Sequence, residues 1–295
     1  MRLVLGLGTA AMLVGPAHAT YSIVATDTAT REVGGAGTSC VGNLSVTVIY
    51  GSVPGKGAVH AQAYLGGPGK NAAVAQLGMD VAPATIISSI TSPSFDGQAQ
   101  TRQYGIVDLM GRSAGFTGSS TMAFTADRQG QIGTYTYSVQ GNILTSAAVL
   151  DQAQGSFETT GCDLADRLML ALEAGALNGE GDSRCTDNFG IPSDSAFIQV
   201  DREGEPSGTY LRLDITDSRP NSPLLGLRVQ YNAWRAGHPC PGTAKPDAGA
   251  STGGDAGNPA QPDGGGCCST SDGGAGSSLL AIGVAVLLRR RRRCS

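Results

Sequence analysis

Residues 17–25 read Ala17-His18-Ala19-Thr20-Tyr21-Ser22-Ile23-Val24-Ala25, and the organisation of the chain follows from them. Ala17-x-Ala19 is the small-residue pattern that signal peptidase cleaves. Cleavage there makes Thr20 the first residue of the mature protein, at the head of a run with β-strand composition. A threonine with a free α-amine is a self-contained catalytic unit, because the amine (pKa about 7.7–8.0) can activate the hydroxyl as a nucleophile. The alternative is that Thr20 is an ordinary residue left by the cut.

The preceding residues have the other features of a signal peptide. Arg2 is followed by an apolar run from Leu3 to Val14 and a break at Pro16. This run is too short to span a bilayer, so residues 1–19 are expected to be removed by signal peptidase on export. Export places the chain in a compartment where disulfides form.

Composition narrows the classes of function. The 295 residues include 44 glycines, only 5% aromatic and 15% charged residues, and a net charge of −4. A weakly charged, acidic chain does not have the basic surface of a nucleic-acid-binding protein. We expect one globular domain over residues 20–235, with many tight turns and an aliphatic core.

The expected elements come in blocks. Strands are predicted at 22–26, 32–39, 46–50, 57–64, 103–107, 112–116, 133–139, 195–200 and 210–215, and helices at 71–77, 83–89, 145–157 and 164–177. Separate blocks of strands and helices favour an α+β fold with largely antiparallel sheets over alternating βαβ units.

Export places the seven cysteines in a disulfide-permissive compartment, and those of the domain are expected to form disulfides. Cys162 and Cys185 bracket a predicted helix and could close a local loop, and Cys40 and Cys240 could join the ends of the domain. Sequence alone leaves the connectivity open. A zinc site is disfavoured because the domain has no C-x-x-C pair and His60 is its only histidine, so no metal or cofactor is expected.

The C-terminal part changes character. Residues 236–266 are rich in Gly, Pro, Ala and Asp and predict a disordered linker. Cys267-Cys268, an apolar run from Leu279 to Leu288 and the arginines 289–293 resemble the myxobacterial-type C-terminal sorting signal. The resemblance implies a sorting protease that cuts near Cys267 or Cys268, and display at the cell surface or outer membrane, with a lipidated cysteine as one form of anchor. A plain C-terminal anchor of marginal length is the alternative.

Two further motifs bear on catalysis. Residues 111–115 match G-x-S-x-G, but the only later histidine is His238, so a hairpin turn is favoured over a Ser113 nucleophile. Gln140-Gly141-Asn142 follows a predicted strand and could direct amide and backbone donors at an oxyanion. The alternative for this tripeptide is a turn that caps the next helix.

Several segments, in order, resemble the family called domain of unknown function 1028, whose members commonly begin Met-Thr-Phe/Tyr-Ser-Ile-Val-Ala. The matching segments are Thr20–Ala25 with Asp27, Gly57–Tyr64, Gln103–Asp108, Phe116–Gly118, Tyr137–Asn142 and Leu164–Gly175. The resemblance covers Thr20 to about Asp214. It departs at residues 40–53, at His60 and at residues 178–195.

The resemblance implies an N-terminal-nucleophile (Ntn) hydrolase-like αββα sandwich, with two antiparallel sheets between helical layers. It implies attack by Thr20 on an amide, with Asp27, Gln140 and Asn142 orienting the N-terminus or forming an oxyanion hole. The expected function is a secreted amidohydrolase acting on a small amide or peptide. The alternative is a non-catalytic binding or adhesion protein displayed at the cell surface. The substrate and the oligomeric state are not predicted.

Overall fold

The computed structural model describes residues 20–65 and 67–241. The predicted signal peptide, most of the linker and the Cys267–Cys268 segment lie outside the described residues. No helix in the described part of the chain combines the length and the apolar character needed to cross a membrane.

In the described part of the chain, ten strands form two antiparallel sheets. The strands are β1 Thr20–Asp27, β2 Glu32–Ser39, β3 Tyr50–Val53, β4 Gly57–Ala63, β5 Arg102–Asp108, β6 Ser113–Thr117, β7 Ala126–Ile132, β8 Tyr135–Asn142, β9 Ser195–Asp201 and β10 Thr209–Ile215. The larger sheet has the order β10-β9-β2-β1-β8-β7, and the smaller has the order β3-β4-β5-β6. The prediction of an α+β fold with antiparallel sheets is confirmed.

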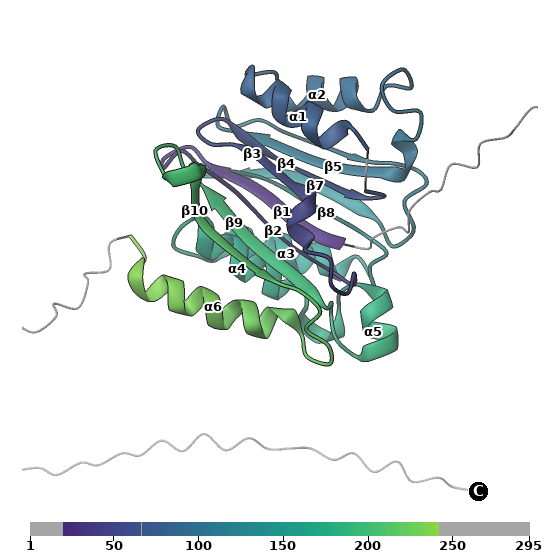
Figure 1. Ribbon diagram of the computed structural model, residues 1–295, viewed down its shortest axis with the longest axis vertical. Helices are drawn as coiled ribbons and strands as arrows, with labels where there is room; N and C mark the ends of the chain where they lie inside the picture. Colours follow the sequence, from purple (N-terminus) through teal and green to yellow (C-terminus); the bar gives the residue numbers. More distant parts are fainter. Residues whose placement is uncertain (1–19, 66, 242–295) are drawn as a thin grey trace, which may run out of the picture. The chain divides into compact units, whose positions relative to one another are not determined.

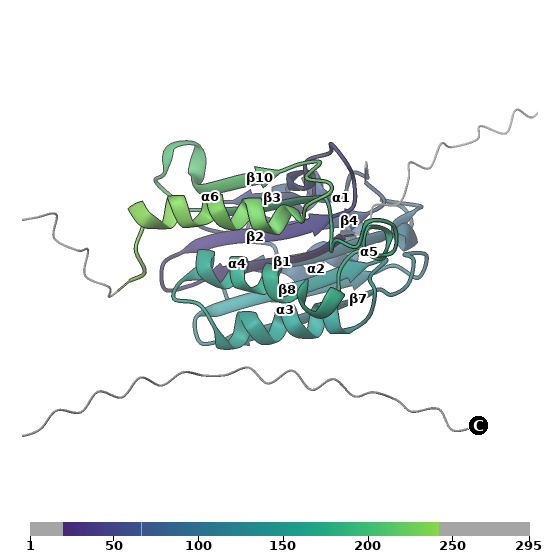
Figure 2. The ribbon, with the colours of Figure 1, turned by 90° about the horizontal axis from the view of Figure 1, so that it is seen from below.

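Helices cover the outer face of each sheet (Figures 1 and 2). The described residues form six α-helices: α1 Gly69–Gly78, α2 Pro83–Ile90, α3 Ala148–Thr159, α4 Leu164–Ala174, α5 Ser183–Phe189 and α6 Pro223–Gly237. Helices α1 and α2 pack on the smaller sheet, and α3, α4 and α6 pack on the larger one. The two sheets face each other through β1, β4, β5 and β8.

The central strand β1 has two different faces because successive side chains alternate. Tyr21 and Ile23 belong to the apolar core beneath the helices, where the Tyr21 hydroxyl donates to the Leu172 carbonyl at 2.8 Å. Ser22 instead bonds with side chains of the opposite sheet. Thr20 lies two residues before Ser22, so its side chain shares the face between the sheets.

Some elements differ from the prediction. Residues 46–50 were expected to form a strand, but Val46–Ile49 form a 3₁₀ helix whose start is capped by the Ser45 hydroxyl, and strand β3 begins at Tyr50. Strand β7 was missed because it is a polar, half-exposed edge strand with no clear alternation. Helix α6 was also missed, although Ser222 caps it and Pro223 occupies its first turn, which are ordinary start signals.

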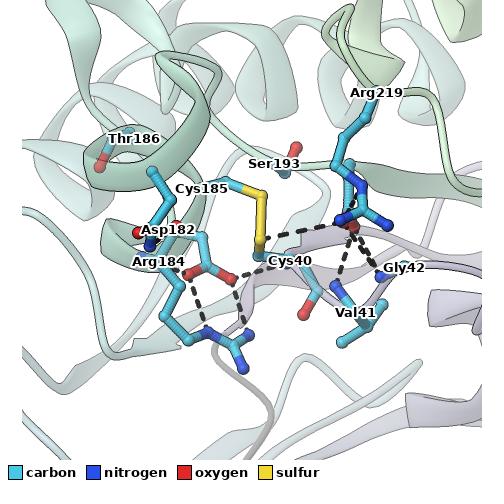
Figure 3. Close-up of a disulfide and its surroundings, with 12 residues drawn as sticks. Cys40, Val41, Gly42, Asp182, Arg184, Cys185, Thr186, Ser193 and Arg219 are labelled. Carbon is cyan, nitrogen blue, oxygen red and sulfur yellow. Dashed lines mark hydrogen bonds and ion pairs between the residues drawn. A yellow bond between two sulfur atoms is a disulfide. The ribbon is translucent and has the colours of Figure 1, made fainter.

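The disulfides join cysteines in a different way from either suggested pairing. Cys40 is bonded to Cys185 and Cys162 to Cys240, with Cα–Cα distances of 5.6 and 5.7 Å. Cys40 follows the end of β2 and meets α5, a helix that was not predicted (Figure 3). The suggested pairings were wrong because they relied on the positions of the cysteines in the sequence. The pairing depends instead on which strand and helix ends the fold brings together.

Candidate active site

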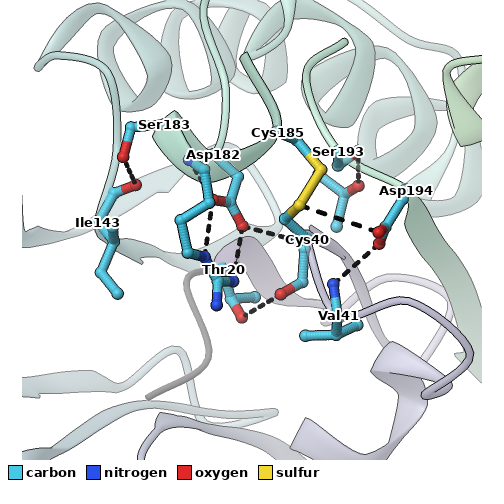
Figure 4. Close-up of polar contacts among 12 residues, drawn as sticks. Thr20, Cys40, Val41, Ile143, Asp182, Ser183, Cys185, Ser193 and Asp194 are labelled. Atoms are coloured by element: carbon cyan, nitrogen blue, oxygen red, sulfur yellow. Dashed lines mark hydrogen bonds and ion pairs between the residues drawn. A yellow bond between two sulfur atoms is a disulfide. The ribbon is translucent and has the colours of Figure 1, made fainter. Parts of the chain in front are cut away.

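Thr20 lies at the end of β1, between the ends of two neighbouring strands. Its register partners are Ser39 on β2 and Asn142 on β8. The Thr20 hydroxyl donates to Ser39 Oγ at 3.2 Å, and Thr20 is only 1% exposed. Figure 4 shows Thr20 beside Cys40, at the end of the sheet where the disulfide lies. The structure therefore brings two of the predicted site residues, Thr20 and Asn142, directly together.

Three buried amide side chains link this strand end to the opposite sheet. Gln62 of β4 donates to the Thr20 carbonyl at 3.1 Å and to Gln103 Oε1 at 2.9 Å. Asn142 donates to the same Gln103 oxygen at 3.2 Å. Because each amide is held by its neighbours, the backbone of Thr20 has a fixed position, which is what preorganised catalysis needs.

Gln140 lies one step deeper on β8, opposite Ser22. Its amide donates to Ser22 Oγ at 2.8 Å and lies 3.2 Å from His60 Nδ1. Ser22 Oγ also donates to Gln62 Oε1 at 2.6 Å. Gln140 thus supports the Thr20 site through this chain of contacts and does not share the position of Asn142.

Asp27 lies at the opposite end of β1. It lies seven positions after Thr20 along the extended strand, which corresponds to roughly 23 Å. Its carboxylate accepts from the Ala29 backbone at 3.0 Å and from the Thr30 hydroxyl at 2.9 Å, so it stabilises the turn between β1 and β2. The structure does not bring Asp27 together with Thr20.

His60 is fully buried between the sheets. Its Nδ1 lies 2.9 Å from Ser22 Oγ, and its Nε2 has no hydrogen-bond partner among the described residues. Nε2 faces Gly35, where an added Cβ would come within 2.3 Å of it. Burial, with a smaller contribution from the charge of Lys70, lowers the pKa of His60 to about 3. His60 is therefore a neutral part of the network.

His60 gives the protein a specific pH dependence. Its pKa is lower in the folded state (about 3) than in the unfolded chain (about 6.5), so its stabilising effect is complete above pH 6.5 and is lost as the pH falls towards 3. We expect the free energy of unfolding to fall by about 2 kcal/mol more between pH 7.5 and 5 in the wild type than in His60→Gln. Urea titrations of both proteins at the two pH values measure this difference, and parallel pH profiles would contradict it.

A second buried cluster holds α5 against the Thr20 end of the sheet. The Asp182 carboxylate accepts from the Cys40 backbone N–H at 2.7 Å and pairs with Arg184 at 3.0 Å. Burial raises the pKa of the Asp182 carboxyl, while the bonds from Arg184 and Cys40 oppose that rise. The Ser183 backbone N–H donates to the Ile143 carbonyl, just after Asn142. The Cys40–Cys185 disulfide, the Asp182 carboxylate and the Ser183 backbone bond together hold the strand ends beside Thr20 in place (Figures 3 and 4).

Two hollows adjoin the site. Thr20 and Ser39 line a narrow apolar one together with Val41, Leu44, Val46, Val48, Ile49 and Leu65. Val48 and Leu65 also line a larger cavity of about 260 Å³, as does Gln62. Lys70, Asn71 and Arg102 give this cavity a polar wall. The larger cavity is thus connected to Thr20 by shared walls and by Gln62.

Two groups of side chains in the described residues have ligand atoms close enough to share a metal ion. One contains Cys40, Cys185 and Asp194, and the other Cys162, Asp166 and Cys240. All four sulfur atoms are already joined in disulfides. These groups are therefore disulfide surroundings and do not offer thiolate ligands.

Sequence reasoning missed several residues of the site. Gln62 could have been found from the sequence, because it lies two positions after His60 and therefore on the same face of the predicted strand. Ser39 and Gln103 carried no such signal, since their role depends on which strands become neighbours.

Ser113 begins β6 directly after the turn at Gly111, so the prediction of a hairpin there is confirmed. His238 stacks on Trp234 in α6.

Comparison with known proteins gives a family and a fold. Residues 20–231 match the model of a family of unknown function, DUF1028. The fold is similar to that in the crystal structure of protein SPO2555 from Silicibacter pomeroyi, described under the same family model. The TM-score is 0.60 at 24% sequence identity, and the match covers 74% of this chain and 89% of the other. The chain has no significant match among curated proteins.

Proposed function

The chain belongs to the DUF1028 family of unknown function, and from the geometry at Thr20 we propose that it is an exported N-terminal-nucleophile amide hydrolase. One observation carries the proposal. The residue that follows Ala17-x-Ala19 is also the first residue of the central strand, and its hydroxyl lies on the face between the sheets, 3.2 Å from Ser39 Oγ.

The layer order supports the same proposal. Helices, sheet, sheet and helices follow one another, and the nucleophile begins a central strand of one sheet, as in an Ntn-hydrolase-like sandwich. Fold alone does not fix activity, so the proposal depends on the residues around Thr20.

The chemistry needs only the first residue and water. The Thr20 hydroxyl attacks the amide carbonyl, and its proton passes to the α-amine. The C–N bond breaks as that proton moves to the leaving amine, which leaves an ester on Thr20. Water then cleaves the ester to a carboxylic acid and restores the hydroxyl. Asn142, opposite Thr20, and the Ser39 hydroxyl are the nearest candidates to stabilise the oxyanion.

The cellular setting is part of the proposal. Signal peptidase would create the catalytic N-terminus, and a protease acting near Cys267 or Cys268 would then attach the protein to the cell surface. The two disulfides of the domain support an oxidising location.

Acylation tests the proposal without knowledge of the substrate. The exported protein is treated with a β-lactone, whose ring opens on attack by an activated hydroxyl. We expect one adduct per chain, mapped by mass spectrometry to the N-terminal peptide, and no adduct on a form that keeps the leader. Absence of the adduct from a chain that begins with a free Thr20 amine would contradict hydrolysis. A non-catalytic role in binding or adhesion would then be the better-supported function.

A further inference from the structure

The cavity beside Thr20 contains a positive charge that no acidic group neutralises. Of its two cationic side chains, Arg102 pairs with Asp96 at 3.0 Å and donates to the Tyr64 carbonyl at 2.6 Å. Lys70 instead donates to the Val48 carbonyl at 2.5 Å. No ion pair among the described residues includes Lys70, and no carboxylate lines the cavity. The cavity therefore has a net charge of about +1.

This charge is held where its solvation is incomplete. Burial lowers the pKa of Lys70. An ammonium group has three donors, and the Val48 carbonyl uses one of them. The neighbouring wall adds donors from the Asn71 amide and the Tyr104 hydroxyl. Lys70 also lies in the first turn of α1, where the helix dipole favours an anion.

The cavity is connected to the proposed nucleophile. Gln62 lines it and also donates to the Thr20 carbonyl at 3.1 Å, while Val48 and Leu65 form walls common to the cavity and to the hollow at Thr20. A group bound at Lys70 would hold the rest of a small molecule towards Thr20. The cavity volume of about 260 Å³ is slightly below the usual range of ligand pockets, roughly 300–1,000 Å³, so it fits a small ligand.

We propose that this cavity is the substrate subsite and that it selects a small amide bearing a carboxylate, which binds to Lys70 while the amide lies at Thr20. The substrate assignment rests on the proposed hydrolase function. A carboxylate carries one negative charge and so matches the single unpaired cation. A phosphate monoester has a charge of about −1.5 to −2, and the single ammonium of Lys70 would neutralise only part of it.

Binding of small probes tests the subsite directly. N-acetylglycine, its neutral analogue N-acetylglycinamide and inorganic phosphate are titrated into the exported protein, with binding followed by ligand-observed NMR. We expect N-acetylglycine to bind about tenfold or more tightly than the carboxamide, as for a hydrogen bond to a charged group. Equal binding of the two amides, or tighter binding of phosphate, would overturn the proposal.

Variants locate the effect. Lys70→Met should remove the preference for the carboxylate, and Lys70→Arg should keep most of it because the charge remains. Lys56→Met is the matched control, because Lys56 also donates to a backbone carbonyl (Gly78, 2.7 Å) but pairs with Asp80 at 2.9 Å away from the cavity. A preference that survives Lys70→Met in a protein with an unchanged melting temperature would overturn the assignment.

The subsite and the hydrolase can fail separately. Thr20→Ala should leave the preference for N-acetylglycine intact, because Lys70 does not depend on the hydroxyl. If the preference is present but Thr20 is never acylated, the anion site stands and the hydrolase fails. If Thr20 is acylated but the carboxylate gives no advantage, the hydrolase stands and the substrate class proposed here is wrong.

Discussion

Replacement of Thr20 by Ala is expected to abolish acylation of the exported protein, with the rate lowered by at least about 10³-fold. The reason is direct, since the bond-forming atom in the proposed reaction is Thr20 Oγ1, and its loss leaves only the amine. Thr20→Ser should retain a measurable rate, because it keeps the hydroxyl and the amine on one residue. The assay is the time course of β-lactone adduct formation, measured as intact mass.

The control for this comparison is Thr159→Ala, at the exposed C-terminal end of α3. It should acylate at the wild-type rate. Each variant must first be shown by mass to begin at residue 20, because a shifted cut would mimic the loss of the nucleophile. A Thr20→Ala protein that begins at residue 20 and still forms the adduct would place the nucleophile elsewhere.

Removal of the disulfide between Cys40 and Cys185 is expected to have the largest effect on stability. The cross-link joins residues separated by 145 positions, and loss of a native disulfide costs about 2–5 kcal/mol. The double variant Cys40→Ala/Cys185→Ala should therefore unfold at a clearly lower urea concentration. It should also acylate about tenfold or more slowly, because Cys40 directly follows Ser39, the partner of Thr20.

The second disulfide provides an internal control. Cys162 and Cys240 are separated by 78 positions, so the chain-entropy effect of their bond is only about 0.5 kcal/mol smaller. This bond ties the start of α4 to the end of α6, where Arg235 also pairs with Asp163. The variant Cys162→Ala/Cys240→Ala should lose stability but acylate at the wild-type rate. Equal slowing in both double variants would mean that acylation follows global stability.

The sequence predicted the central strand correctly for a physical reason. Thr20 to Asp27 alternate between an apolar face and a face between the sheets, and the pattern is local. The same local reasoning placed Gln140-Gly141-Asn142 just after a strand, whereas they are the last three residues of β8, where Asn142 lies opposite Thr20. Gln140 was predicted to act at Thr20, but its side chain contacts Ser22 and His60 instead of Thr20.

What could not be predicted depends on contacts between distant segments. Asp27 matched a family segment, but an extended strand separates it from Thr20 by its full length. The partners of Cys40 and Cys185 depend on where α5 meets the end of β2, which no local pattern records. No local pattern marks Lys70, and its position as the unpaired cation of the cavity depends on the fold, which pairs Arg102 with Asp96.

The identity of the mature N-terminus decides whether Thr20 can act as the nucleophile. The protein exported by its native host is purified, and its first residues are determined by intact mass and N-terminal sequencing. We expect Thr20-Tyr21-Ser22 with an unmodified α-amine. A chain that begins at Ala19 or Tyr21, or one whose amine is blocked, would contradict this expectation, because the hydroxyl and its base would no longer belong to the same residue.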